Sequence, residues 1–271
     1  MVDRQGSSLR VVLAVLVVFG AFAGTAYAIE LAPHRAFYSM KLGAMRAAAG
    51  IIGASGAMYM EWAESCEGWT LMQRIRLQLS NIENRIVETD SSFSSWESKD
   101  GLSYRFTVRN MRNGTVIDDL RGRASLEGSG MGGVAAFTRP EGKKLHLPKG
   151  AVFPTEHVAQ LIDRAQAGDK RMSRIVFDGS SLDGPFEVNA VIGPALEAKG
   201  EGAGGKALTS RPSWRMRLAF FPVQSPAPEP DYELGVRLFD NGVAGDLVLD
   251  YGDFTLLATL ERIEALAKPA C

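Results

Sequence analysis

Leu102-Ser103-Tyr104-Arg105-Phe106-Thr107-Val108-Arg109 alternates apolar and polar side chains without a break. Successive side chains of an extended strand point to opposite faces, so this pattern places one face against a core and the other in water. The segment 69–80 repeats the pattern, with Ile75 and Leu77 on one face and Arg74 and Arg76 on the other. Both segments are predicted to be half-buried β-strands.

Strand-like segments of this kind fill most of the chain. They cover residues 35–42, 55–62, 69–80, 85–96, 102–109, 115–126, 133–138, 143–147, 174–177, 186–191, 214–223, 232–239, 245–249 and 254–266. Turn signals separate them, including Asp100-Gly101 and Asn113-Gly114, in which Gly and Asn tolerate positive φ. About fourteen strands predict an all-β protein with a single large antiparallel sheet, curled or closed so that few edges stay bare.

One segment departs from the strand pattern. After Pro154, apolar residues recur at helical spacing, Thr155 is a candidate cap, and Gly168 is placed to end the segment. We expect one short amphipathic helix of about 13 residues that covers an end or a concave face of the sheet. Residues 199–213 and 222–230 are rich in small, polar or proline residues and are predicted to be loops.

The N-terminal stretch predicts a cleaved export signal. Arg4 and Arg10 precede an apolar run of 13 residues at 11–23, and Ala26-Tyr27-Ala28 supplies the small residues that a signal peptidase accepts. The run is shorter than the roughly 18 apolar residues that indicate a membrane-spanning helix. We expect removal of residues 1–28, a single domain at 29–271 and no integral membrane segment; a retained N-terminal span is the alternative.

Composition excludes one class of partner. The chain has 30 Lys and Arg against 31 Asp and Glu, for a net charge of −1. Proteins that bind nucleic acid usually show a basic excess, so no nucleic-acid partner is expected.

The two cysteines, Cys66 and Cys271, lie far apart in the sequence. An oxidising compartment preserves structural disulfides, and two cysteines permit one intramolecular pairing. We expect this pairing, which closes a loop of about 200 residues and stabilises the fold by at most roughly 5 kcal/mol in the chain-entropy model. A free thiol at Cys271 and an intermolecular bridge are the alternatives.

Several motifs resemble catalytic or cofactor sites without their structural context. Two glycine triplets, Gly128/Gly130/Gly133 and Gly200/Gly202/Gly205, match a dinucleotide-binding spacing, but neither is predicted to open a helix. Gly179-Ser180-Ser181-Leu182-Asp183 has Asp where a nucleophile elbow needs its second Gly. Both patterns are interpreted as turns, and no cofactor is expected.

The remaining polar candidates are interpreted as structural. His34, His146 and His157 lack the spacing of metal ligands and are each expected to bond to backbone or a carboxylate, so no metal site is predicted. Glu97 and Asp100 flank a turn, either as a carboxylate pair or as a solvated hairpin tip. Asn113-Gly114-Thr115 matches a glycosylation sequon and is interpreted as a hairpin turn. Four tryptophans, Trp62, Trp69, Trp96 and Trp214, are expected to fill the core, and the lining of a hydrophobic groove is the alternative.

Several short runs, taken together, resemble the EipB family of periplasmic cell-envelope integrity proteins. The matching runs are Pro33-His34-Arg35-Ala36, Ser65-Cys66-Glu67-Gly68-Trp69, Glu97-Ser98-Lys99-Asp100-Gly101, Leu147-Pro148-Lys149-Gly150, Phe153-Pro154-Thr155-Glu156-His157 and Phe177-Asp178-Gly179-Ser180. The resemblance implies one spiral-like antiparallel sheet of about fourteen strands, a disulfide between Cys66 and Cys271, and a role in maintaining the envelope. It implies no catalytic residue.

These observations give three hypotheses of function. The first is a non-enzymatic periplasmic protein that supports envelope integrity by binding a partner protein or an envelope component. The second is a carrier of lipid or lipoprotein acyl chains in an open groove of the sheet. The third is a hydrolase of envelope polymers, for which His157 and Asp178 are the candidate residues.

Overall fold

The structure, a computed structural model, describes residues 29–46, 50–198, 205–224 and 227–271. These residues form β1 (His34–Met45), β2 (Ile51–Glu64), β3 (Gly68–Asn81), β4 (Ile86–Ser98), β5 (Ser103–Arg112), β6 (Thr115–Leu126), β7 (Gly133–Arg139), β8 (Glu141–Leu147), β9 (Ala151–Val152), β10 (Arg171–Val176), β11 (Phe186–Leu196), β12 (Ser213–Pro222), β13 (Tyr232–Phe239), β14 (Ala244–Asp250) and β15 (Phe254–Ala265). Two helices accompany them, α1 (Pro154–Gln166) and α2 (Gly205–Thr209).

All fifteen strands belong to one sheet, in the order β8-β7-β6-β5-β4-β3-β2-β1-β15-β14-β13-β12-β11-β10-β9. Strands that follow each other in the chain are neighbours within each half, and β1 pairs with β15 where the halves meet. Pairing is antiparallel except between β9 and β10. The fold is therefore the predicted all-β sheet, built as two meanders joined at their first and last strands.

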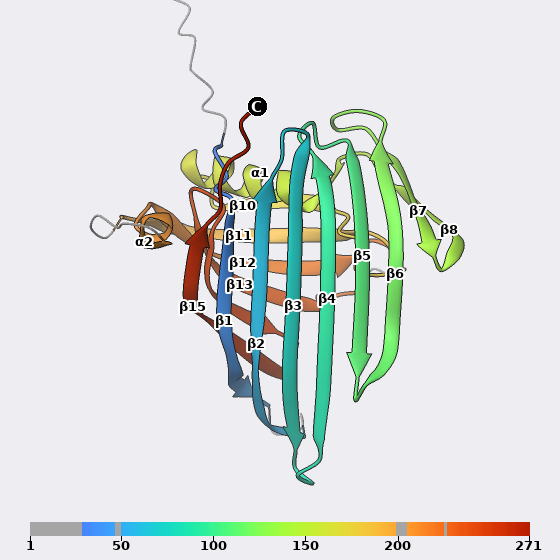
Figure 1. Cartoon of the computed structure of the whole chain (residues 1–271), viewed down its shortest axis with the longest axis vertical. Helices are drawn as coiled ribbons and strands as arrows, with labels where there is room; N and C mark the ends of the chain where they lie inside the picture. The colour runs from blue at the N-terminus through green and yellow to red at the C-terminus, as the bar shows by residue number, and fades with distance from the viewer. Residues whose placement is uncertain (1–28, 47–49, 199–204, 225–226) are drawn as a thin grey trace, which may run out of the picture.

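The sheet folds over on itself into a nearly closed barrel (Figure 1). Strands β1 to β6 run upright in one wall, and β10 to β13 cross behind them at a steep angle. This arrangement is that of near-orthogonal sheet packing, in which the inward faces of two layers share one core. The edge strands β8 and β9 are joined by a tight turn, in which the backbone N–H of Ala151 donates to the carbonyl of Pro148 at 3.2 Å.

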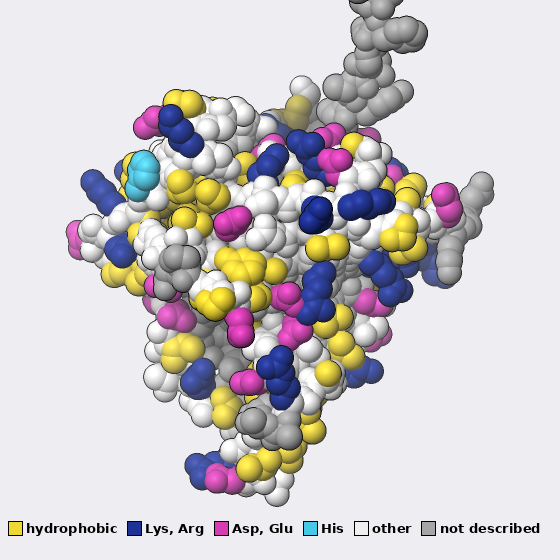
Figure 2. Space-filling model, turned by 180° about the vertical axis from the view of Figure 1, so that it is seen from behind, with side chains coloured by type: hydrophobic (Ala, Val, Ile, Leu, Met, Phe, Trp, Pro, Cys, Tyr) yellow, Lys and Arg dark blue, Asp and Glu magenta, His cyan; other side chains and the backbone are white. Residues whose placement is uncertain are grey.

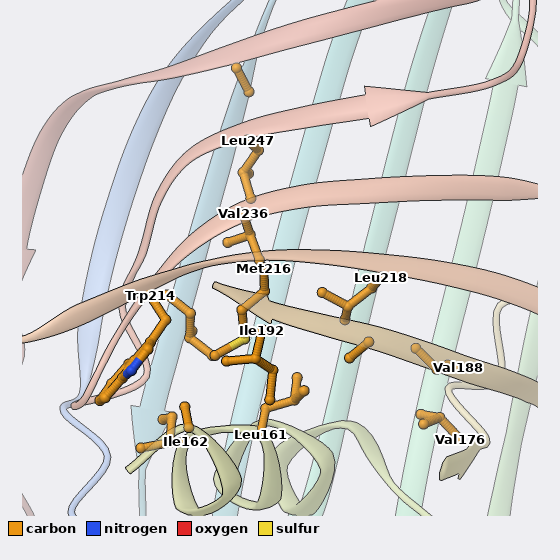
Figure 3. Packing of buried hydrophobic residues seen from close by; sticks show 14 of the residues in the cluster. Leu161, Ile162, Val176, Val188, Ile192, Trp214, Met216, Leu218, Val236 and Leu247 are labelled. Carbon is orange, nitrogen blue, oxygen red and sulfur yellow. The ribbon is translucent and has the colours of Figure 1, made fainter. Parts of the chain in front are cut away.

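Helix α1 lies across one end of the barrel and contributes to the larger core cluster (Figure 3). Leu161 and Ile162 point from the helix towards Trp214 and Met216 of β12 and Ile192 of β11. Burial of such side chains contributes about 1.5–3 kcal/mol each. The predicted role of the helix as a cover is thus confirmed.

A second, aromatic cluster fills the space beneath β5 to β8. Tyr104 and Phe106 are 1% and 2% exposed, as the alternation of 102–109 predicts. The ring of Tyr104 stacks on Phe153 with centroids 4.8 Å apart, and its hydroxyl donates to the carbonyl oxygen of Asp178 at 3.0 Å. Phe177 completes the cluster from the opposite wall. The predicted strand faces are therefore correct here.

The structure corrects three details of the expectation. It adds β9, whose two residues are too few for any periodic pattern, and the short helix α2 within the predicted loop at 199–213. Helix α1 begins at Pro154 with Phe153 as the preceding residue, so Thr155 is not its cap. Gly168, at φ +84°, follows the end of the helix as predicted. The predicted export signal, residues 1–28, lies outside the described residues.

Candidate functional site

A cleft of about 650 Å³ opens where residues 29–31 and the C-terminal tail meet the N-terminus of α1. We name it the clamp cleft; its lining is Ile29, Glu30, Leu31, Glu64, Trp69, Glu97, Ser98, Lys99, Gly101, Thr155, Glu156, Ala159, Lys268, Pro269 and Cys271. Residues that precede β1, residues of the C-terminal tail and residues from the middle of the sequence therefore form one site.

A disulfide bond lies at one side of the clamp cleft. Cys66, in the turn between β2 and β3, is joined to Cys271 across 205 positions, with Cα atoms 5.7 Å apart. Two further contacts hold the tail: the backbone N–H of Leu266 donates to the carbonyl of Pro33 at 2.9 Å, and Lys268 forms an ion pair with Glu30. The C-terminal tail thus lies along the start of the domain.

Glu97 forms the floor of the clamp cleft and caps α1. Its two carboxylate oxygens accept the backbone N–H groups of Thr155 at 2.7 Å and Glu156 at 2.9 Å. These are unpaired donors of a first helical turn, and the helix dipole favours a negative charge at this position. Burial raises the pKa of Glu97 to about 7, although the two backbone donors oppose the shift. Glu97 is therefore a structural carboxylate that titrates near neutrality.

The opposite wall of the cleft combines an aromatic ring with a charge pair. The ammonium of Lys99 lies 4.3 Å from the centroid of the Trp69 ring and forms an ion pair with Glu64. Trp69 also packs edge-on against Trp62, with ring centroids 5.8 Å apart. The cleft consequently presents an apolar ring beside carboxylates and ammonium groups, a surface suited to a polar ligand or peptide.

The structure does not assemble the predicted hydrolase site. Asp178 accepts hydrogen bonds from the backbone N–H of Ser180 at 2.9 Å and from its hydroxyl at 2.7 Å, which forms a turn. His157 lies on the buried face of α1, where burial and, secondarily, the positive charge of Arg174 lower its pKa to about 4. Within the described residues, no hydrogen bond joins His157 to Asp178 or Ser180.

The other candidates separate in space. Asp100 stays exposed and accepts the N–H of Leu102 at 2.9 Å, so it forms the solvated tip but no pair with Glu97. His34 has Nδ1 2.8 Å from the carbonyl of Ala32, as expected. Nε2 of His34 and Nε2 of His157 have no partner among the described residues. His146 is exposed on β8. No metal-holding group of His, Cys, Asp and Glu occurs in the described part of the chain.

The glycine and tryptophan expectations are mostly confirmed. The first glycine triplet leads into strand β7 and opens no helix, as predicted. In the second triplet, Gly200 and Gly202 lie outside the described residues. Gly205 begins the five-residue α2, so the prediction that this triplet opens no helix was wrong. Asn113, at φ +49°, forms the predicted turn with Gly114. Trp62, Trp69 and Trp214 are buried, whereas Trp96 lies on the outer face of β4.

The sequence did not reveal that Glu97 caps α1. One signal was available: Phe153 precedes Pro154 at the position where Ser, Thr, Asp or Asn usually caps a helix. A helix start without its own cap needs an acceptor from elsewhere, and a buried carboxylate supplies it.

Within the part of the chain that the structure describes, neither α1 nor α2 has the length and apolarity of a membrane-spanning helix.

Comparison with known proteins gives consistent matches. The family model described as EipB-like matches residues 25–267. The cell envelope integrity protein EipB of Brucella abortus is 31% identical over 254 residues, covering 91% of this chain and 88% of that protein. The crystal structure of a beta-barrel-like protein of a domain of unknown function, DUF1849, from Brucella abortus superposes with a TM-score of 0.79 at 29% identity, covering 89% of this chain and 100% of that one. The chain therefore belongs to the EipB-like family.

Proposed function

We propose that this protein is a periplasmic, non-enzymatic component that supports cell envelope integrity by binding a partner protein or an envelope component at the clamp cleft. The support comes from the relative named for envelope integrity and from the clamp cleft itself. In this proposal residues 1–28 are removed on export, and residues 29–271 act as one domain.

The chemistry of the cleft favours binding over turnover. Its four acidic side chains already serve structural contacts: Glu97 caps α1, Glu64 pairs with Lys99, Glu30 pairs with Lys268, and Glu156 accepts a hydrogen bond from the side chain of Gln160 at 2.8 Å. A general acid or base must be available to a reacting group, which these engaged carboxylates are not. A rim of mixed charge around an aromatic ring instead resembles a polar recognition surface.

A blocking substitution tests the proposal. Ala159, on α1, lines the clamp cleft, so Ala159→Trp fills it without replacing a core side chain. Asn189→Trp, on the exposed face of β11, is the matched control. In a deletion strain that has become sensitive to detergent, the control should restore resistance and Ala159→Trp should not. Full rescue by a folded Ala159→Trp protein would contradict the proposed site.

One observation favours the carrier function as a second candidate. At the end of the barrel away from α1, inward apolar side chains such as Ile75, Leu77 and Leu234 pack against the core but remain only partly buried. A row of this kind offers contact to an acyl chain. Native mass spectrometry of protein purified without detergent should then show bound lipid, which Leu234→Gln should reduce; lipid-free protein would exclude this function.

A further inference from the structure

The outer face of the upright wall carries a second groove, away from the clamp cleft. Its volume is about 540 Å³, and its outward lining side chains come from β3 to β7. We name it the arginine groove; the groups used below are Trp96, Arg105, Thr107, Arg121, Arg123 and Thr138. Because Tyr104 and Phe106 point into the core, the alternating Arg105 and Thr107 must point outward.

Arginines in the groove stand opposite one another across the strands. Arg105 of β5 is the direct partner of Arg123 of β6, and Arg121 of β6 is the direct partner of Arg139 of β7. Like charges directly opposite in a sheet destabilise it. Asp119 relieves the second pair through an ion pair with Arg139 at 2.6 Å. In the part of the chain that the structure describes, Arg105, Arg121 and Arg123 have no carboxylate partner.

The charge of this face differs from that of the whole molecule. Six cations, Arg105, Arg109, Arg121, Arg123, Arg139 and Lys144, lie on neighbouring strands, and the carboxylates beside them are Asp119 and Glu141. The complete chain carries a net charge of −1. On the opposite side of the molecule, cations and carboxylates are interspersed (Figure 2). Uncompensated positive charge therefore surrounds the arginine groove on β5 and β6, where it attracts an anion.

The groove holds donors suited to oxyanions on a hydroxyl-rich chain. Guanidinium groups donate in a fork that matches a carboxylate or phosphate, and the hydroxyl of Thr107 lines the same groove. The hydroxyl of Thr138 donates to the carbonyl of Arg121 at 3.3 Å, so it can offer a ligand only an acceptor. Arg105 is held over the Trp96 ring, with its guanidinium carbon 4.9 Å from the centroid, so its orientation is fixed before a ligand arrives.

The strand pairing around the arginine groove argues against a peptide ligand. Strands β4, β5 and β6 are each paired on both sides, so their backbone N–H and C=O groups are already used by neighbouring strands. An extended peptide gains much of its affinity from free groups at a sheet edge, which this groove lacks. Recognition here depends on side chains, and a saccharide with acidic groups and hydroxyls matches those side chains.

We propose that the arginine groove binds a linear acidic polysaccharide, whose carboxylates or phosphates accept hydrogen bonds from Arg105, Arg121 and Arg123. The cationic positions continue from β5 across β6 to Lys144 on β8. A chain with an anionic group on successive sugars would contact several of them at once. This inference does not require the clamp cleft to be a binding site, so either proposal stands without the other.

The test uses polygalacturonate, a carboxylated polysaccharide, and calorimetry on the complete mature chain. Wild-type protein should bind it, and Arg105→Gln with Arg123→Gln should weaken binding by about tenfold or more, since two charge-assisted contacts are lost. Arg171→Gln with Arg215→Gln removes the same charge from exposed positions of β10 and β12 and should leave binding unchanged. The groove variant should melt no lower than wild type, because a repulsive pair is removed.

Three comparisons make the result decisive. Binding to polygalacturonate should weaken as salt is raised, whereas neutral dextran should not bind. Equal binding of dextran, or full binding by the groove variant, would overturn the proposal. Polyglutamate that binds as tightly as polygalacturonate would also overturn it, because charge alone would then explain the affinity. Failure of wild-type protein to bind polygalacturonate would exclude the groove as a polysaccharide site.

Discussion

The carboxylate of Glu97 accepts the backbone N–H of Thr155, 58 positions later in the chain, at 2.7 Å, and the end of β4 thereby caps helix α1. The contact connects the upright wall to the helix that covers the barrel. It also places a buried acidic group at the floor of the clamp cleft.

Removal of this cap should destabilise the protein. Glu97→Ala leaves two backbone donors buried without an acceptor, for an expected loss of about 2–4 kcal/mol in the free energy of unfolding. Urea denaturation measures this loss. Asp100→Ala, three positions away and exposed, is the control and should cost less than about 1 kcal/mol. Equal effects of the two substitutions would contradict the capping role.

Glu97 should also give stability a specific pH dependence. Its folded-state pKa of about 7 lies above the ordinary 4.5, so between these values the unfolded chain releases a proton that the folded protein retains. Stability contributed by the protonated group is complete below about pH 4.5 and is lost as pH rises through about pH 7, by at most about 3 kcal/mol. The advantage of wild type over Glu97→Gln should therefore shrink across this window in urea titrations. A constant difference would show that Glu97 does not titrate there.

His157 should give the stability of the protein the opposite pH dependence. Its folded-state pKa of about 4 lies below the ordinary 6.5, so the unfolded chain takes up a proton first as pH falls. Stability is lost as pH falls from about 6.5 to about 4, by at most about 3 kcal/mol. His157→Leu should lose less stability than wild type over this range in the same titrations. His146→Leu, at an exposed position, should follow the wild-type curve.

Two glycines allow backbone strain to be separated from crowding. Gly179 has φ +73°, and an added Cβ would lie 2.4 Å from the Phe106 ring; Gly150 has φ +82° with nothing within 4 Å. Gly150→Ala should cost about 1–2 kcal/mol from strain alone. Gly179→Ala should cost about 3 kcal/mol or more, since the aromatic cluster must also move. Thermal unfolding tests the order, and equal melting temperatures would contradict it.

Loss of the disulfide should weaken the whole fold. Cys66 and Cys271 are 205 positions apart, and their bond constrains the unfolded chain. Cys271→Ser removes this constraint and should lower the free energy of unfolding by up to about 5 kcal/mol. Reductant should lower the urea midpoint of wild type towards that of the variant and leave the variant unchanged. Peptide mapping without reduction should recover the Cys66 and Cys271 peptides as one species. Equal midpoints under oxidising conditions would show that the bond adds no stability.

The sequence predicted what alternation and turn chemistry encode locally. Tyr104, Phe106 and Val108 are buried as the pattern of 102–109 requires, because a strand with one wet face has only one orientation. Strand β9 was missed, since its two residues carry no period and depend on pairing with β10. The position of α1 followed from helical spacing, but its cap is a carboxylate supplied from another strand.

The candidate sites could not be predicted from the sequence, because they too depend on contacts between distant segments. The clamp cleft joins residues near 30, 65, 97, 155 and 270, and only the closed sheet brings them together. The pairing of Arg105 with Arg123 depends on the register of β5 and β6, which the turn and its bulge determine. The alternation predicts that each arginine lies on the solvent-facing side of its strand. It does not predict which residue of the neighbouring strand lies directly opposite.

The pairing of β1 with β15 has a consequence for the order in which the protein is assembled. A polypeptide made from its N-terminus presents β1 to β8 long before β15 exists, and until then one side of β1 has no neighbour. The seam between the two meanders forms only from segments more than two hundred positions apart, so its closure is slow compared with hairpin formation. Until the seam closes, the flank of β1 is an open edge that can pair with another strand.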